Sequence, residues 1–223
     1  MSRKRDFSRR QVLEMSTALA GLIMATPVSS VVAQQKLRRT PDQVLGPFYP
    51  LTKPVDRGAD LTVVSGKSGR AQGQVVHVMG RVLNLQGKPI PGARVEIWQA
   101  NAQGRYTHAS DRNPAPLDPN FDGFGVQVTD GEGHYRFKTI KPGAYPTPIS
   151  GWTRPPHIHF DVTGRTDKLV TQLFFENDPL NDKDMLLQSS WAKELLTTKL
   201  LPPTQDLEQD SLLALWDIIV PQG

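Results

Sequence analysis

The sequence contains no cysteine among its 223 residues. The chain therefore cannot form disulfides, and its stability must come from a hydrophobic core, which a chain of this length can bury. It also cannot bind a metal ion through thiolate sulfur. Any metal site in this protein must use oxygen and nitrogen donors, and such donors favour harder ions.

The chain also lacks the excess of basic residues that is typical of nucleic-acid-binding proteins, although its formal net charge is +4. Of its 26 basic and 22 acidic residues, five and two lie within residues 1–33, which leaves 21 and 20 in the rest of the chain. A domain this close to neutrality has no large basic field to attract a polyanion. We therefore expect no nucleic-acid partner.

A long uninterrupted apolar run is missing as well. The mildly apolar stretch 15–33 contains several hydroxyl residues and Pro27, so it would make a poor transmembrane helix. Arg9-Arg10 precede this stretch in the manner of a twin-arginine signal, and residues 31–33 are small enough for a cleavage site. We expect residues 1–33 to be an export signal, which predicts a periplasmic or extracellular protein with no stable membrane span after signal removal.

Helical periodicity is scarce, and only residues 183–199 and 205–214 could form short helices. Residues 34–73 are predicted to form an extended arm, because closely spaced prolines in its first part break helices and central strands. From residue 74 onward, apolar and polar residues alternate between Gly- and Pro-containing turns. The sequence therefore predicts an all-β fold, with an antiparallel β-sandwich over 74–223, long loops and few short helices. The alternating apolar positions are Val95 and Ile97, Val126 and Val128, Tyr135 and Phe137, and Ile158, Phe160 and Val162.

His157 and His159 are the first candidates for a metal site. Side chains at i and i+2 of a strand point to the same face, so the two imidazoles lie side by side, about 7 Å apart at the backbone. Ile158 and Phe160 face the core on the other side of the strand. Two such imidazoles can converge on one ion, although two hydrogen-bonded or exposed histidines would give the same pattern.

Two loop tyrosines are candidates for further ligands. Tyr106 follows Gly104-Arg105, and Tyr145 lies in a loop that contains Pro142-Gly143 and Pro146. Taken singly, each tyrosine could equally well be an apolar side chain that packs its ring.

Short motifs follow one another in a specific order from Thr40 towards the C-terminus. They are Thr40-Pro41, Gly46-Pro47-Phe48-Tyr49-Pro50, Pro89-Ile90-Pro91-Gly92-Ala93, Trp98-Gln99-Ala100-Asn101, Gly104-Arg105-Tyr106, Asp118-Pro119-Asn120-Phe121, Gly123-Phe124, Lys141-Pro142-Gly143-Ala144-Tyr145-Pro146, Arg154-Pro155-Pro156-His157-Ile158-His159-Phe160 and Thr171-Gln172-Leu173-Phe174-Phe175. In this order the chain resembles the intradiol ring-cleavage dioxygenases, the family of protocatechuate 3,4-dioxygenase and catechol 1,2-dioxygenase.

The resemblance implies a ferric ion, Fe(3+), held by Tyr106, Tyr145, His157 and His159. The spacings of 39 residues from Tyr106 to Tyr145 and 12 residues from Tyr145 to His157 match the family's ligands. Phenolate is a hard, strongly donating anion, which favours iron(III) over iron(II). The resemblance further implies a catechol-type substrate, O2 as co-substrate, ring cleavage between the two hydroxylated carbons, and a muconate-type diacid as product.

The resemblance also implies roles for residues around the metal. Tyr145 would leave the metal when substrate binds and help to accept a substrate proton. Arg154 would stabilise negative charge on the ring, with Gln172 beside it. Without the resemblance, Arg154 would be interpreted as a surface ion-pair residue and Gln172 as a polar strand residue. Asp111-Arg112-Asn113 follow Tyr106 and are candidates for the mouth of the pocket.

The match to the protocatechuate enzymes is incomplete. Those enzymes commonly carry a tryptophan two residues after the second tyrosine ligand, where this chain has Thr147. They also pair two different chains, so the resemblance allows an oligomer and a second type of subunit. The sequence leaves open whether the substrate is catechol, protocatechuate, hydroxyquinol or another catechol.

Two other interpretations fit parts of the sequence. Residues 80–95 also resemble transthyretin-like modules, so a non-catalytic, exported β-sandwich binding module is the alternative function. The H-x-H pattern recurs in cupins, but His77, His108 and His134 do not complete a cupin metal motif. The joint presence of four candidate ligands and Arg154 favours the enzyme.

Overall fold

The computed structural model describes residues 37–53, 58–147, 149 and 151–222. These residues belong to one compact unit, 35–223. The predicted export signal, residues 1–33, lies outside the described residues and stays a prediction. Within the described part of the chain, no helix has the length and apolar character needed to cross a membrane.

Strands dominate the described residues, and the helices are short, as the sequence predicts. The strands are β1 (Val75–Asn84), β2 (Arg94–Trp98), β3 (Phe124–Val128), β4 (His134–Ile140), β5 (Tyr145–Pro146), β6 (Thr153–Arg154), β7 (His157–Thr163), β8 (Lys168–Phe175), β9 (Thr197–Thr198), β10 (Leu200–Leu201), β11 (Leu212–Leu215) and β12 (Ile218–Val220). The helices are the 3-10 helix η1 (Asn181–Lys183), the α-helix α1 (Met185–Gln188) and the 3-10 helix η2 (Lys193–Leu196).

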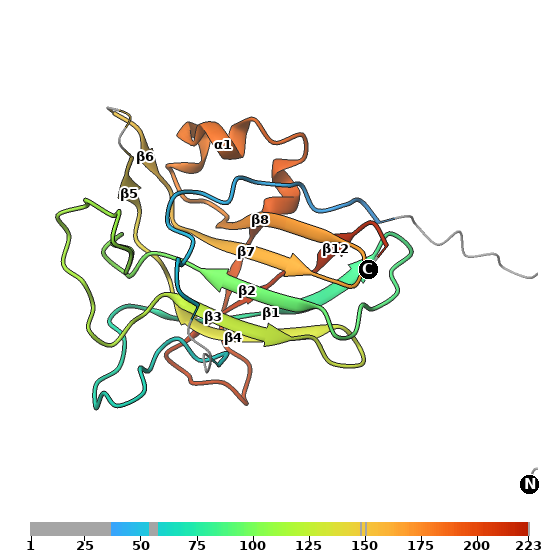
Figure 1. The fold of residues 1–223 in the computed structure, drawn as a ribbon, viewed down its shortest axis with the longest axis horizontal. Coiled ribbons are helices and arrows are strands. Elements are labelled where there is room, and N and C mark those ends of the chain that lie inside the picture. The colour runs from blue at the N-terminus through green and yellow to red at the C-terminus, as the bar shows by residue number, and fades with distance from the viewer. Residues whose placement is uncertain (1–36, 54–57, 148, 150, 223) are drawn as a thin grey trace, which may run out of the picture. The chain divides into compact units, whose positions relative to one another are not determined.

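The strands form two five-stranded sheets and one small hairpin (Figure 1). In the first sheet the order is β10-β11-β1-β12, and β4 also pairs with β1. In the second sheet the order is β3-β2-β7-β8-β9, and β5 and β6 form the separate hairpin. Neither sheet closes into a barrel, so each sheet has one face that can be buried against the other.

One hydrophobic core lies between the two sheets. Val78 and Phe137 of the first sheet and Ile97 and Phe160 of the second are completely buried in it. The ring of Phe160 lies 5.0 Å from that of Trp216, measured between centroids. The period-two pattern therefore identified the buried faces of β2, β4 and β7, because alternation along a strand reflects burial of one face.

The valines of strand β3 lie on the opposite face of the sheet from the one that the alternating pattern predicts. Val126 is opposite Glu96 in the register with β2, and Val128 is opposite Arg94 and 59% exposed. Both valines thus lie on the outer face of the second sheet. The core-facing positions of β3 include Gly125, whose missing side chain makes room for Leu61.

The prediction of an antiparallel sandwich is correct only in part, because the pairing is mixed. Strands β11 and β12 both pair with β1 in parallel, and β9 pairs with β8 in parallel. Alternation shows which face of a strand is buried but contains no information about strand direction. The long connections in the C-terminal part of the chain allow β11 and β12 to run in the same direction as β1, and β9 in the same direction as β8.

The helix prediction for 183–199 is confirmed in part, because α1 and η2 lie there, whereas that for 205–214 is wrong. Residues 212–215 form β11, with Leu212 opposite Val76 of β1. The leucine-rich run has helical propensity, but pairing with β1 satisfies its backbone groups and buries Leu213.

Residues 37–53 of the arm run along the edge of β8 and then over the outer face of the second sheet (Figure 1). The backbone N–H of Gln43 donates to Val170 O at 2.8 Å, and Thr171 Oγ1 donates to Pro41 O at 2.8 Å. Over this stretch β8 has no strand partner on that side, since β9 pairs only with Phe174 and Phe175. The arm therefore covers an exposed strand edge and closes one end of the sheet.

Gly80 is expected to be intolerant of a side chain. The break between β11 and β12 lies opposite Gly80, and a Cβ there would overlap the carbonyl oxygen of Trp216. We expect Gly80→Ala to lower the free energy of unfolding by about 1–3 kcal/mol, the usual range for overpacking. Gly131 has open space around its Cα, so Gly131→Ala is the matched control. Urea denaturation tests the pair, and equal midpoints would contradict the close approach of Trp216 to β1.

Candidate metal centre

His157 and His159 lie on the outer face of β7, as strand parity predicts, but this face is not exposed. Each histidine is only 2% exposed. Their Nε2 atoms lie 3.2 Å apart. Imidazole nitrogens bind a transition metal at about 2.1 Å, so two such ligands at right angles are about 3 Å apart. The two rings are therefore close enough to share one ion.

Contacts with neighbouring groups fix the orientation of both imidazole rings. His157 Nδ1 lies 2.7 Å from the carbonyl oxygen of Pro155, so Nδ1–H donates there and Nε2 keeps its lone pair. The ring of His159 stacks on Trp98 with 4.7 Å between centroids. The arm packs Gly46 against the other side of His159, where an added Cβ would lie 3.1 Å from the ring.

The protein environment keeps both imidazoles neutral. Burial lowers the pKa of His157 and of His159 well below the ordinary value, and the Arg154 cation lowers both further. A neutral imidazole presents a lone pair, which is the form that binds a metal.

The β5–β6 hairpin brings Tyr145 to the histidines. Tyr145 is directly opposite Arg154 in the antiparallel register of this hairpin. Its ring centroid lies 5.5 Å from that of His157. Pro155 and Pro156 then connect β6 to β7, so the hairpin that carries Tyr145 is coupled to the histidine strand by a stiff link.

Two glycines allow the loop of Tyr106 to pack against the loop of Tyr145. A Cβ on Gly104 would overlap Ala144 O, and Gly143 N–H donates to Asn101 O at 2.9 Å. This backbone-to-backbone packing places the rings of Tyr106 and Tyr145 5.3 Å apart, edge to face. Each glycine lies two residues before its tyrosine.

The loop 111–113 supports Tyr106 and does not line the mouth of the pocket near Tyr145. The Asp111 carboxylate accepts the backbone N–H of Tyr106 at 2.7 Å. The Asn113 side chain donates to Gly104 O at 2.8 Å. Asp111 and Arg112 border a separate cavity of about 390 Å³, which Tyr106 also lines.

The two phenols fit a metal site better than an apolar core. Burial raises the pKa of Tyr106 well above the ordinary value, and nearby Tyr145 adds to this effect. Burial also raises the pKa of Tyr145, while Arg154 opposes the increase. With protein groups alone around them, both phenols keep their protons at neutral pH, so a cation is needed to bind them as phenolates.

The hydroxyl oxygen of Tyr106 is itself an indication of a missing partner. It is buried, and among the described residues it has no hydrogen bond of good geometry, although the hydroxyl of Tyr145 lies near enough to interact with it. Buried polar atoms without a partner are rare and call for an explanation such as an ion. The described residues contain no group of three or more His, Cys, Asp or Glu that could hold a metal. Any metal at His157 and His159 therefore needs the tyrosines as ligands.

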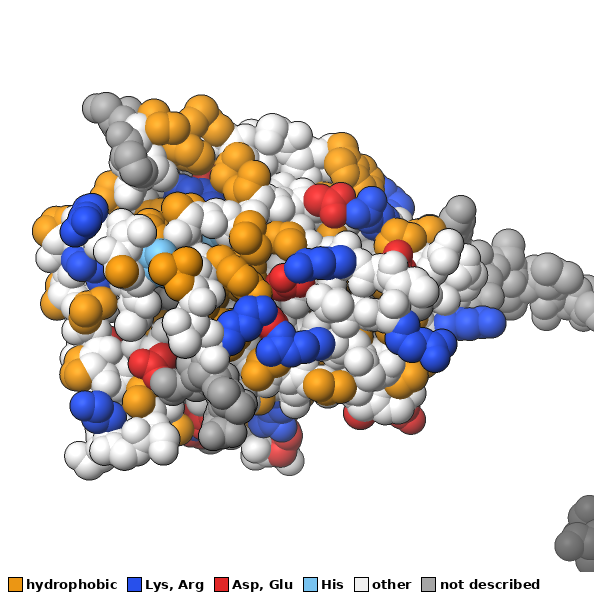
Figure 2. All heavy atoms as spheres, viewed as in Figure 1, with side chains coloured by type: hydrophobic (Ala, Val, Ile, Leu, Met, Phe, Trp, Pro, Cys, Tyr) orange, Lys and Arg blue, Asp and Glu red, His pale blue; other side chains and the backbone are white. Residues whose placement is uncertain are grey.

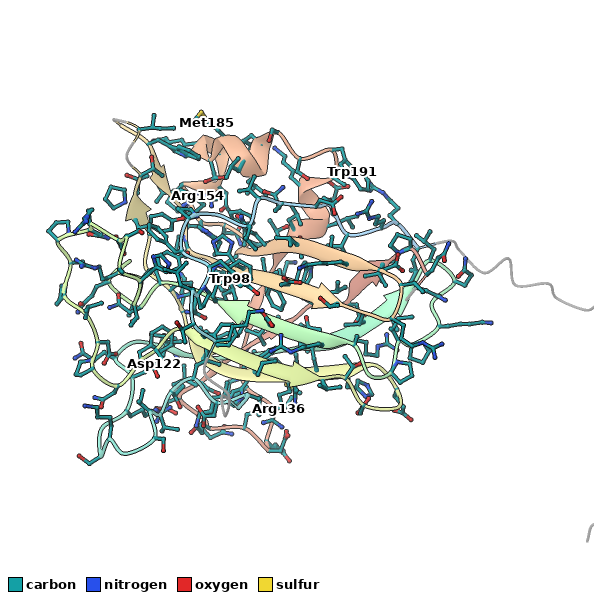
Figure 3. All side chains as sticks on the ribbon, in the orientation of Figure 1. Trp98, Asp122, Arg136, Arg154, Met185 and Trp191 are labelled. Carbon is teal, nitrogen blue, oxygen red and sulfur yellow. The ribbon has the colours of Figure 1, made fainter. Side chains whose placement is uncertain are left out.

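Arg154, which Figure 3 labels near the base of the β5–β6 hairpin, interacts with the candidate ligands His157 and Tyr145 and is held by buried partners. Its Nε donates to Asp184 Oδ2 at 2.9 Å, and its Nη2 donates to Gln172 Oε1 at 2.8 Å. Its Nη1 lies 3.1 Å from His157 Nε2. Burial alone would lower the pKa of Arg154, but Asp184 and Tyr145 outweigh this effect and raise it. Arg154 is thus a permanent cation at the site.

The sequence analysis did not identify Asp184, which is completely buried. Besides pairing with Arg154, its Oδ1 accepts the N–H of Leu187 at 2.8 Å and caps α1. The pattern of an aspartate before Met-Leu-Leu-Gln could have indicated the cap. It could not have indicated Arg154 as a partner, because that contact spans 30 residues of sequence.

A cavity of about 330 Å³ opens next to Tyr145 and Arg154. Its volume falls in the usual range for small-molecule sites. A larger cavity of about 410 Å³ lies near η1 and β9 and contains none of the candidate site residues. The 330 Å³ cavity, which we call the Tyr145 cavity, is lined by both Tyr145 and Arg154, whereas the 390 Å³ cavity is lined by Tyr106 alone of the candidate site residues, so the Tyr145 cavity is the candidate substrate site.

Comparison with known proteins identifies the class to which this site belongs. The family model described as "Dioxygenase" matches residues 44–221. The chain belongs to this dioxygenase family, which is a family of enzymes and not of binding modules.

Individual relatives act on different aromatic substrates. The chain is 50% identical over 135 residues to the protocatechuate 3,4-dioxygenase beta chain of Burkholderia cepacia, covering 59% of this chain and 57% of the relative. It is 35% identical over 150 residues to the hydroxyquinol 1,2-dioxygenase of Rhizobium sp. (strain MTP-10005), covering 61% and 48%. The structure of catechol 1,2-dioxygenase from Acinetobacter sp. ADP1 matches with a TM-score of 0.63 and 25% identity, covering 82% and 62%. The chain thus spans about half the length of the curated relatives that it matches.

The Arg154–Asp184 pair is expected to be important for stability. Asp184→Ala leaves a buried guanidinium without its counter-ion and removes the cap of α1, so we expect a loss of about 3–5 kcal/mol in the free energy of unfolding. Asp184→Asn should lose less, because its amide oxygen can still cap the helix. Asp182→Ala removes an exposed carboxylate from the preceding turn and is the control. An Asp184→Ala protein with wild-type urea stability would contradict the buried pair.

Proposed function

We propose that this protein is an intradiol dioxygenase that cleaves the ring of a catechol-type substrate between its two hydroxylated carbons. The observation that carries the proposal is the convergence of two neutral imidazoles, two buried phenols and one buried cation beside a cavity. In the overall reaction both oxygen atoms of O2 enter the product, the carbon–carbon bond breaks, and a muconate-type diacid forms. No external reductant is needed for this balance.

The donor set supports iron(III) as the cofactor. Tyr106, Tyr145, His157 and His159 would hold it through two phenolate oxygens and two imidazole nitrogens, a set that favours a hard, highly charged ion. When bound, iron(III) would act as a Lewis acid that lowers the pKa of the catechol hydroxyls and activates the ring towards O2.

Side chains of the protein would accept the substrate proton, stabilise the charge on the ring and exclude water. Tyr145 borders the Tyr145 cavity and Tyr106 does not, so Tyr145 is the phenol that a substrate can reach. Its oxygen is suited to accept a proton from a substrate hydroxyl. Arg154 provides a fixed positive charge next to the reacting ring, where low polarity strengthens its field. The apolar cavity walls exclude water from the reacting groups.

We also propose that the protein is exported, on the basis of the signal-like residues 1–33. The twin-arginine type of signal serves folded proteins, which suits a cofactor that is inserted before export. The resemblance to enzymes with two types of chain further allows an oligomer or a second subunit, which a sedimentation experiment on the purified protein would reveal.

The purified protein is expected to be coloured. Tyrosinate bound to iron(III) gives a red-brown charge-transfer band, so protein from iron-replete cells should absorb visible light and contain about one iron per chain. Removal of the iron by a chelator should abolish the band and the activity together. A colourless, iron-free protein from such cells would count strongly against the proposal.

Substitution of a proposed metal ligand should reduce O2 uptake, whereas substitution of a histidine outside the site should not. We expect Tyr145→Phe and His157→Ala each to reduce catechol-dependent O2 uptake by about 100-fold or more, because each removes a metal donor. His134→Ala is the control, since His134 lies exposed at the start of β4. Full O2 uptake by His157→Ala would remove His157 from the ligand set.

A further inference from the structure

We infer that the Tyr145 cavity selects catechols that are unsubstituted or carry an uncharged substituent, and that it discriminates against a ring carboxylate. This inference rests on the proposed function and narrows its substrate class. It matters because the relatives include enzymes for protocatechuate, which bears a carboxylate, for hydroxyquinol and for catechol.

The walls of the Tyr145 cavity are mainly apolar. They include Val44 and Phe48 from the arm, Ile149 and Trp152 from the β5–β6 hairpin, and Leu186 from α1. Figure 2 shows hydrophobic side chains grouped where the hairpin and α1 reach the surface. Apolar walls favour an apolar substituent and penalise the desolvation of a charge.

Arg154 is the only charged side chain among the described residues that line this cavity, and two of its three nitrogens donate to buried groups of the protein. Nε and Nη2 donate to Asp184 and Gln172, neither of which is a candidate metal ligand. Nη1 faces His157, so it is directed to the metal end of the site. Asp184 also neutralises the charge of Arg154 and would repel a second carboxylate nearby. A substituent carboxylate would therefore enter the cavity without a cationic partner.

The uncharged polar groups of the walls offer hydrogen bonds but no positive charge. Thr147, which stands where protocatechuate enzymes commonly have tryptophan, uses its hydroxyl within the hairpin: Oγ1 donates to Trp152 O at 3.1 Å and accepts from Ile149 N–H at 3.2 Å. The indole Nε1 of Trp152, which also lines the cavity, is buried and has no hydrogen-bond partner among the described residues. It can donate to an uncharged polar substituent such as an additional ring hydroxyl, but it cannot neutralise a carboxylate.

The separate cavity near Tyr106 is the competing location for a charged substrate. Arg105 and Arg112 line it, and both could attract a carboxylate. Tyr106 lines it, but neither Tyr145 nor Arg154 does, so a ring bound there would lack the two groups to which we assign proton transfer and charge stabilisation. We therefore assign substrate binding to the Tyr145 cavity and use Arg112 as an independent test.

A substrate panel with the iron-loaded protein tests the inference. We expect kcat/KM for catechol, 4-methylcatechol and hydroxyquinol each to exceed the value for protocatechuate by about 100-fold or more. Protocatechuate turned over as efficiently as the other three would overturn the inference and leave the proposed function intact. A protein that turns over none of the four would instead overturn the proposed function.

A new cation in the cavity should reverse the preference. Leu186 lines the Tyr145 cavity and is half-buried, whereas its neighbour Met185 is 51% exposed and does not line it (Figure 3). We expect Leu186→Arg to raise the ratio of kcat/KM for protocatechuate to that for catechol by about 10-fold or more. Met185→Arg adds the same charge one residue away and should leave the ratio unchanged.

Two further variants make the result decisive. Ile149→Arg introduces the cation from the hairpin instead of α1, so it replaces Leu186→Arg if that variant melts at a lower temperature than the wild type. Equal ratios in Leu186→Arg, Ile149→Arg and Met185→Arg would overturn the assignment of the cavity. Loss of protocatechuate turnover in Arg112→Ala, with catechol turnover unchanged, would place the substituent in the other cavity and would also overturn it.

Discussion

The buried ion pair between Arg154 and Asp184 is the interaction on which the site depends, because it connects four segments of the chain. Arg154 belongs to the β5–β6 hairpin, and Asp184 precedes α1. Gln172 of β8 accepts from the same guanidinium and donates from its own amide to Val44 O of the arm at 2.8 Å. The pair therefore fixes the hairpin, the helix and the arm around His157. Each of these segments also contributes a wall to the Tyr145 cavity.

A second constraint is the need to bury polar groups while keeping their donor atoms directed at one point. The arm covers the outer face of β7, which would otherwise be solvated, and so turns two surface histidines into buried ones. The close approach of the Gly104 and Gly143 loops brings two phenols to the same place. Burial then lowers the pKa of the imidazoles and raises that of the phenols. The imidazoles have the protonation state that binds a metal, whereas the phenols would need a cation to release their protons, so the ion that we propose for this site would have to be strongly polarising.

The same burial accounts for the selectivity that we infer. A site that is closed on three sides by apolar segments can hold one permanent cation only if an anion is buried with it, and Asp184 meets that requirement. The arrangement keeps the field of Arg154 directed at the reacting ring while offering no free charge to a substituent. Substrate preference in this protein would then follow from the walls of the cavity and not from its metal ligands.

The sequence by itself determined the local features of the protein. Alternation located β2, β4 and β7 and placed His157 and His159 on one face, because the period of side chains along a strand is fixed by backbone geometry. Family-specific motifs identified Tyr106, Tyr145, Arg154 and Gln172, and the structure brings them together beside the histidines. Only the tertiary structure decided the parallel pairing of β11 and β12 with β1, the strand at 212–215 and the partnership of Asp184 with Arg154. These features depend on contacts between residues far apart in the chain, and local propensity and periodicity contain no information about which distant segment will supply the partner.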